Sequence, residues 1–83
     1  MNDHMGFEIV VNTIPHSVQD AKVTWDQVVE FAYPGQKDDP RYVFKVQYED
    51  AVSQPKSGTL VKGKHVEVGR TGTTFSALRS VVS

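Results

Sequence analysis

Cysteine is missing from this chain of 83 residues. The protein therefore cannot form a disulfide, hold zinc through thiolates or use a cysteine as a nucleophile. A lack of disulfides is typical of proteins kept in a reducing compartment, so the sequence favours a cytoplasmic location.

Long apolar runs and an excess of one charge are missing as well. No stretch approaches the roughly 20 apolar residues needed to span a bilayer, and residues 1–6 lack the basic and apolar regions of a signal peptide. We expect these residues to form a flexible N-terminal arm, and we expect no membrane partner. The net charge of -1 provides no basic stripe of the kind that binds phosphates, so we also expect no nucleic-acid partner.

The residue patterns that support catalysis or metal binding are also absent. No serine lies in a G-x-S-x-G context, and no glycine-rich segment has the G-x-x-x-x-G-K-[ST] spacing of a phosphate-binding loop. The histidines lack the paired spacing that favours a metal site: His4, His16 and His65. We therefore expect neither enzymatic activity nor a bound metal or cofactor.

One segment, residues 23–33, has the pattern of an amphipathic helix. Thr24 and Gln27 have the spacing of a capping box, in which each side chain bonds the backbone amide of the other residue. Pro34 and Gly35 then end the helix, because the residue before proline resists the α conformation and glycine accepts a left-handed one. The apolar residues fall on one stripe at i, i+3, i+4 and i+7: Trp25, Val28, Val29 and Ala32.

The remaining segments have the pattern of strands. Residues 7–13 are rich in β-branched and aromatic side chains, and residues 42–48 alternate between apolar and polar positions as a half-buried strand does. Residues 14–16 predict a turn. The other predicted strands are short or terminal and cover residues 16–18, 58–61, 65–68 and 73–82.

A hairpin, one helix and then further strands predict an α+β fold, the β-grasp roll, with a mixed sheet of four to five strands. The first and last strands can lie parallel at the centre, because the helix provides the long crossover that parallel strands need. No linker divides the chain, so we expect one domain over residues 7–79 and a C-terminal tail over residues 80–83. The predicted core sets the helix stripe against Phe7, Ile9, Val11, Phe44, Val46 and Phe75.

Four segments between residues 7 and 83 have a familiar pattern: FEIVVNTIPHSV, KVTWDQVVEFAYPG, YVFKVQYEDA and GTLVKGKHVEVGRTGTTFSALRSVVS. Their most specific pieces are the Val-Asn pair after the first strand, the short V-T-x-x-Q-V-V helix, Ala-Tyr-Pro and the G-T-L-V…G…V-x-V hairpin. Together these segments resemble bacterial ubiquitin-like proteins of the multiubiquitin-domain type.

The resemblance implies a protein modifier rather than an enzyme. Relatives are encoded in bacterial operons beside an activating enzyme of the adenylating ThiF type, a conjugating-enzyme-like protein and a peptidase of the JAB or another type. Several of these operons are linked to phage defence. The activating enzyme uses ATP to adenylate the modifier's C-terminal carboxylate, which passes as an ester or thioester to an amine or hydroxyl of a target protein.

By this resemblance the end of the chain is a conjugation tail that comprises Leu78, Arg79, Ser80, Val81, Val82 and Ser83. The tail departs from that of ubiquitin because it lacks Gly-Gly. Glycine suits a tail that enters a narrow channel, since it has no Cβ, whereas Val81 and Val82 are β-branched. Three alternatives follow: the partner enzymes accept a different tail, a peptidase trims it, or the protein is not conjugated.

A mildly basic group of residues predicts a docking face for the activating enzyme, made of Val43, Lys45 and Arg70 with Lys62, Lys64, Leu78 and Arg79 around it. In a β-grasp, Lys45 lies on the solvent face, and Arg70 and Arg79 flank the last strand. Ordinary surface charge explains the same pattern equally well. The alternative function is a non-conjugated β-grasp module that binds a partner by an edge strand or a sheet face. A sulfur carrier needs a terminal glycine, and Ser83 disfavours it.

Overall fold

The computed structural model describes residues 6–82. In chain order its elements are β1 (Phe7–Val11), β2 (Ile14–Val18), β3 (Lys22–Thr24), α1 (Trp25–Ala32), β4 (Tyr42–Glu49), β5 (Gly58–Leu60), β6 (His65–Glu67) and β7 (Thr73–Val81). Residues 1–5 and Ser83 lie outside the described part, and with them lies most of the predicted N-terminal arm.

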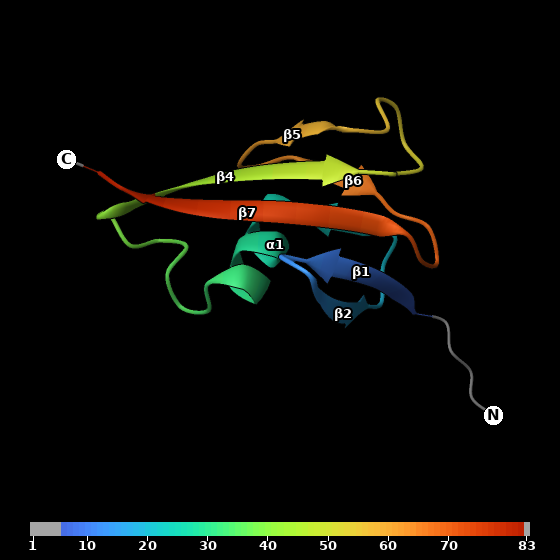
Figure 1. The fold of residues 1–83 in the computed structure, drawn as a ribbon, viewed down its shortest axis with the longest axis horizontal. Coiled ribbons are helices and arrows are strands. Elements are labelled where there is room, and N and C mark those ends of the chain that lie inside the picture. Colours follow the sequence, from blue (N-terminus) through green and yellow to red (C-terminus); the bar gives the residue numbers. More distant parts are fainter. Residues whose placement is uncertain (1–5, 83) are drawn as a thin grey trace.

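The main sheet has five strands in the order β2-β1-β7-β4-β5. The first and last strands, β1 and β7, lie parallel next to each other, while the other neighbouring strands are antiparallel. Helix α1 packs across one face of this sheet, and the opposite face is open to solvent (Figure 1). This mixed sheet with one helix confirms the predicted α+β, β-grasp fold.

The first hairpin turns at a different place from the one predicted. Asn12 and Thr13 connect β1 to β2, and both have a positive φ, of 50° and 72°. Two such residues make the tight turn whose twist matches the twist of the flanking strands, and asparagine tolerates this conformation better than most residues. The predicted turn at residues 14–16 is therefore wrong, because β2 already begins at Ile14.

Helix α1 is capped as the sequence predicts. The Thr24 amide donates to Gln27 Oε1 at 3.0 Å, and the Gln27 amide donates to Thr24 Oγ1 at 3.1 Å. The helix is shorter than predicted, since residues 22–24 are extended and pair with β6. That small second sheet, β3 with β6, was not predicted, because three residues are too few to show a periodicity. Within residues 6–82 no helix has the length and apolar character to cross a membrane.

The core lies between α1 and the main sheet. Trp25, Val28 and Val29 are the buried helix residues, as predicted, and Ala32 is half-buried at the rim. Of the predicted strand positions, Phe7 and Phe44 are half-buried at the two ends of the core. The others are fully buried: Ile9, Val11, Val46 and Phe75.

Candidate functional site

Strand β7 carries the predicted conjugation tail, and its first residues have neighbouring strands on both sides. We call residues 73–77 the inner half of β7. Within it, β1 pairs with residues 73–75 and β4 pairs with residues 74–77. Thr73 is fully buried, and its hydroxyl donates to the Asp50 carbonyl at 2.8 Å. A buried polar group that finds its partner in this way fixes the start of the strand.

The inner half ends at Ala77, whose backbone is bound by two side chains. The Asn12 side chain accepts from the Ala77 amide at 2.9 Å and donates to the Ala77 carbonyl at 3.0 Å. The Tyr33 hydroxyl donates to the same carbonyl at 3.1 Å. The Asn12 side chain thus replaces the backbone of β1 as the hydrogen-bonding partner of β7 at Ala77, where β1 has already turned away. Sequence reasoning missed both residues, although an asparagine directly after a strand is a signal for such a turn.

The rest of β7, residues 78–81, is its outer half, and it has a neighbouring strand on one side only. Register with β4 runs from Glu49↔Thr74 to Tyr42↔Val81, and the Val82 amide adds a bond to the Arg41 carbonyl at 2.7 Å. On the other side β1 has already ended opposite Phe75. The side chains are exposed, with 58% of Leu78 and 70% of Val81 accessible.

The predicted boundary between domain and tail at residue 80 falls inside β7 in the structure. Ser80 pairs with Val43, and Val81 pairs with Tyr42, so both are strand residues. The physical reason is that β4 extends far enough to offer them partners and that valine favours the extended conformation. Ser83 lies outside the described residues.

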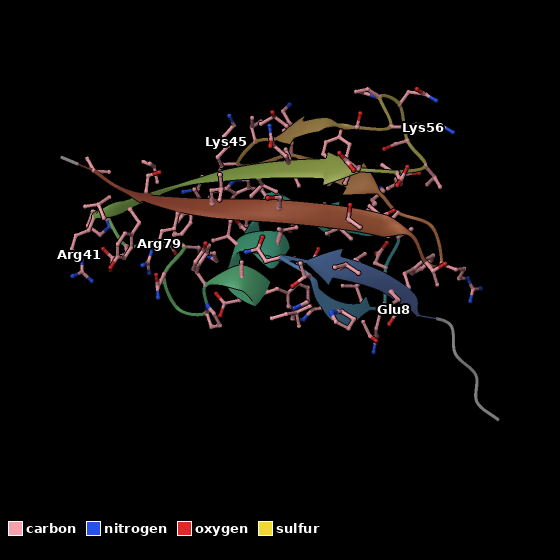
Figure 2. All side chains as sticks on the ribbon, viewed as in Figure 1. Glu8, Arg41, Lys45, Lys56 and Arg79 are labelled. Carbon is pink, nitrogen blue, oxygen red and sulfur yellow. The ribbon has the colours of Figure 1, made fainter. Side chains whose placement is uncertain are left out.

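Arg79 lies on the helix side of the sheet and not on the predicted basic face. Its guanidinium carbon is 4.5 Å from the centre of the Tyr42 ring and 5.3 Å from that of Tyr33. Its Nη1 donates to Gln36 Oε1 at 2.6 Å. Alternation along β7 causes this placement, because Arg79 shares a face with the buried Phe75 and Ala77. The contacts tie the outer half to the loop that follows α1, where Figure 2 shows Arg79 and Arg41 at the same end of the molecule.

The open face of the sheet, opposite α1, brings two of the three predicted docking residues together. Val43 and Lys45 are alternate residues of β4, opposite Ser80 and Leu78 of β7 respectively. Val43 is 53% exposed and Leu78 is 58% exposed. Lys45 projects from this face (Figure 2). Two apolar side chains and a cation are therefore exposed beside the start of the predicted tail.

Arg70 lies at the other end of the sheet. Its carbonyl accepts from the Glu8 amide at 2.8 Å, and its guanidinium carbon is 5.5 Å from the centre of the Phe7 ring. Arg70 precedes Thr73, the first residue of β7, and Leu78 follows five residues later, which is roughly 17 Å along a strand. The predicted face of Val43, Lys45 and Arg70 is therefore not a single patch.

The loop after α1 holds the end of β4 through an ion pair. Arg41 Nη2 lies 2.8 Å from Asp39 Oδ2, and Arg41 Nε donates to Asp39 Oδ1 at 3.1 Å. Because these hydrogen bonds favour the charged carboxylate, they lower the pKa of Asp39 to about 2 and raise the pKa of Arg41. The Asp39 amide also donates to the Gln36 carbonyl, so the loop that meets Arg79 is internally braced.

The histidines are placed apart from one another. The His16 ring stacks on Phe31 with 4.2 Å between ring centres, and His65 lies in β6, while His4 is outside the described residues. Among residues 6–82 no group of three or more histidine, aspartate or glutamate side chains is arranged to hold a metal ion.

Comparison with known families agrees with the geometry. The family model described as multiubiquitin matches residues 7–80, which is nearly the whole chain. Comparison with curated proteins and with solved structures gave no match. The match begins at the first residue of β1 and ends within the outer half of β7, so it spans the sheet, the helix and the start of the tail. By its sequence and its ubiquitin-like β-grasp fold, the chain belongs to the multiubiquitin family.

Proposed function

We propose that this protein is a ubiquitin-like modifier whose C-terminal carboxylate is adenylated by an activating enzyme and transferred to a target protein. The observation that supports this most directly is the outer half of β7. It is exposed, it is paired on one side only, and it runs from the centre of a ubiquitin-like sheet towards the end of the chain.

The proposed chemistry takes place on the partner enzymes. A carboxylate oxygen of the tail attacks the α-phosphorus of ATP and expels pyrophosphate, which leaves an acyl adenylate. A hydroxyl or thiol then displaces AMP to form an ester or thioester. An amine or hydroxyl of the target attacks that carbonyl, breaks the ester or thioester bond and releases the hydroxyl or thiol. In this scheme the chain itself is not an enzyme and needs no cofactor, since ATP binds to the activating enzyme.

The tail has to leave the sheet to enter an active site. Release of residues 80–82 breaks the backbone bonds of Ser80 to β4 and the bond from the Val82 amide to Arg41. Each such bond contributes about 1 kcal/mol net, so the end of the strand can open without unfolding the inner half. The β-branched pair of Val81 and Val82 then requires a channel wider than one that fits glycine, or a peptidase that trims the chain first.

The proposed partner set follows the family resemblance. It comprises a ThiF-type activating enzyme, a conjugating-enzyme-like protein, a peptidase of the JAB or another type, and a target, within a bacterial pathway linked to phage defence in the cytoplasm. We place the dock for the activating enzyme on Val43, Lys45 and Leu78, since they surround the root of the tail. Arg70 would contribute only to a partner that covers the whole length of the sheet.

Incubation of the protein with ATP and the ThiF-type enzyme encoded beside it tests the proposal. We expect a mass increase of the chain that corresponds to the adenylate, or a higher-mass covalent adduct with the enzyme. Fragmentation of the adduct by mass spectrometry shows which residue carries the new bond. If an enzyme that is active on ATP forms neither product, the proposal is wrong.

Two variants separate the tail from the dock. Deletion of residues 80–83 should abolish adduct formation and leave the fold intact, because these residues contribute no buried side chain within the described part of the chain. Lys45→Glu should slow the reaction several-fold through repulsion at the dock. Lys56→Glu is the matched control, because Lys56 carries the same charge change in a loop at the opposite end of β4 (Figure 2). Equal rates for the two lysine variants would remove Lys45 from the dock.

A non-conjugated interaction module is the alternative, and the pairing of Ser80 and Val81 with β4 favours it. In that case a chain that lacks residues 80–83 keeps its partner, while Lys45→Glu loses it. Capture of the same partner by the full chain and by the truncated chain from host extract distinguishes the two functions.

A further inference from the structure

Strand β4 has an uncovered edge at its first residues. Its pairing with β7 covers the whole strand, from Tyr42 to Glu49, but β5 pairs only with residues 46–48. The chain leaves this line after Leu60, where the Lys64 amide donates to the Val61 carbonyl and closes a turn. Beside residues 42–44 the described part of the chain therefore supplies no strand.

The backbone groups at this edge point outward. The Val82 amide donates to the Arg41 carbonyl, so odd-numbered residues of β4 face β7 and even-numbered residues face away from it. The Tyr42 amide is bound by the Asp39 carbonyl at 3.2 Å. The Tyr42 carbonyl and both backbone groups of Phe44 remain, and they face the side without a strand. A short row of this kind is a template for an added strand.

A shallow groove of about 240 Å³ lies beside these backbone groups. We call it the edge groove; its lining residues are Trp25, Lys37, Tyr42, Val43, Phe44 and Lys62. Its floor is aromatic, because the Trp25 and Phe44 rings meet edge to face with 6.2 Å between their centres. Trp25 is only 6% exposed, so packing fixes its ring and a ligand can touch only a small part of it.

Two lysines line the edge groove, and one of them, Lys37, lies near three acidic side chains: Asp38, Asp26 and Glu30. Lys62 Nζ is 5.6 Å from the centre of the Trp25 ring. Lys37 Nζ is 3.0 Å from an oxygen of Asp38, whose side chain is 75% exposed. A surface ion pair of this kind contributes little to stability, so a carboxylate of a ligand can take the place of Asp38.

At the opposite side of the sheet, the outer strand β2 is less suited to pairing with an added strand, because Pro15 has no amide hydrogen.

We propose that the edge groove is a second docking site, which accepts an extended acidic segment of a partner protein as an added strand beside residues 42–44. The segment would bond the backbone of Tyr42 and Phe44, lay alternate side chains on Trp25, and direct carboxylates to Lys37 and Lys62. The side chains of Tyr42 and Phe44 lie on the helix side of the sheet, whereas Val43 and Lys45 lie on the open face. The site can therefore be filled whether or not the protein is a modifier.

The test uses a synthetic peptide of eight residues, with four valines in the middle, two glutamates on each side and both ends blocked, so that carboxylates reach both faces of the added strand. Trp25 is the only tryptophan in the chain, so its fluorescence reports on the edge groove directly. We expect the peptide to change this fluorescence and to shift the Phe44 amide resonance, with an affinity that falls as salt is added. The same peptide with glutamine in place of glutamate should bind at least tenfold more weakly.

Charge reversal locates the binding. Lys62→Glu should weaken binding of the glutamate peptide at least tenfold, and Lys37→Glu provides a second, independent variant at the opposite wall. Lys56→Glu makes the same charge change far from the groove and should leave the affinity within twofold (Figure 2). Thermal unfolding of each variant checks that the fold is kept.

Several results would overturn the proposal. These are no binding of the glutamate peptide, equal binding of the glutamine peptide, or equal losses with Lys62→Glu and Lys56→Glu. Amide shifts centred on Lys45, Leu78 and Ser80 in place of Phe44 would also overturn it, because they would assign the peptide to the open face. The activation assay with ATP uses neither the peptide nor Lys62, so either proposal can fail while the other holds.

Discussion

The two halves of β7 have different surroundings. In the inner half, TTFSA, β1 pairs with the first three residues and β4 with the last four, and alternate side chains are buried. The outer half, LRSV, keeps only β4 as a neighbour, and none of its side chains is buried. The change falls at Ala77, where Asn12 and Tyr33 bind the backbone. One strand thus combines an anchor in the core with an exposed segment that is paired on one side only, and the boundary lies where the side chain of a turn residue, Asn12, binds Ala77.

The largest expected difference between the halves comes from truncation of one apolar side chain in each. Phe75 is 3% exposed and Leu78 is 58% exposed. Phe75→Ala should lower the free energy of unfolding by about 3–5 kcal/mol, because it leaves a cavity in the core. Leu78→Ala should lower it by less than about 0.5 kcal/mol. Urea denaturation of both variants measures the contrast, and comparable losses would show that the outer half is also part of the core.

The boundary itself can be moved through Asn12. Asn12→Gly removes both side-chain bonds to Ala77 and keeps a residue that adopts the positive φ of 50°. We expect a loss of about 1–3 kcal/mol, since the backbone groups of Ala77 lose a partner in a partly buried place.

Thr13→Gly is the matched control for this variant. Thr13 has a φ of 72° and is exposed, so glycine there should be neutral or slightly stabilising. If both glycine variants lose the same stability, the turn and not the Asn12 side chain holds Ala77.

The outer half can be loosened alone through Arg79. Arg79→Ala removes the contacts with Tyr42, Tyr33 and Gln36, and we expect it to change the free energy of unfolding by less than about 1 kcal/mol. Hydrogen exchange of the Ser80 and Val82 amides should become faster, while that of the Ala77 amide stays the same. Arg79→Lys keeps the charge without the planar group and should give an intermediate exchange rate. Faster exchange at Ala77 as well would mean that the two halves open together.

The smallest expected effect concerns the loop that braces the outer half. The pKa of Asp39 is lowered to about 2 by hydrogen bonds from Arg41, below the ordinary value of about 3.9. The Asp39–Arg41 contact should therefore be complete above about pH 4 and be lost as the pH falls through 2. Carboxyl carbon shifts measured by NMR follow this titration. Arg41→Gln should move the midpoint for Asp39 up to near 4, and an unchanged midpoint would rule out Arg41 as the cause.

The sequence predicted the elements of the fold well where its periodicity was long. The capping pair Thr24 and Gln27, the alternation in residues 42–48 and the apolar stripe of the helix all recur in the structure. The first turn could not be located in the same way, because Asn12 and Thr13 compete with Pro15 as turn-forming residues. The tertiary register, which puts Val11 opposite Ile14, decides between them.

The candidate site was predictable only in part. Alternation along the last strand could have placed Arg79 with Phe75 and Ala77, since residues two apart share a face. Arg70 belongs to a loop, and a loop residue has no periodicity from which its position follows. The one-sided pairing of residues 78–81 depends on where β1 ends and on how far β4 extends, and both are properties of the assembled sheet.

The contacts of Arg79 with two tyrosine rings have a consequence for proteolysis. A protease that cleaves after arginine needs the residues around the cut to be extended and free of other partners. Cleavage between Arg79 and Ser80 therefore has to wait until the guanidinium has left Tyr33 and Tyr42 and the strand has parted from β4. The rate at which trypsin cleaves this one bond then measures how often the outer half of β7 separates from β4.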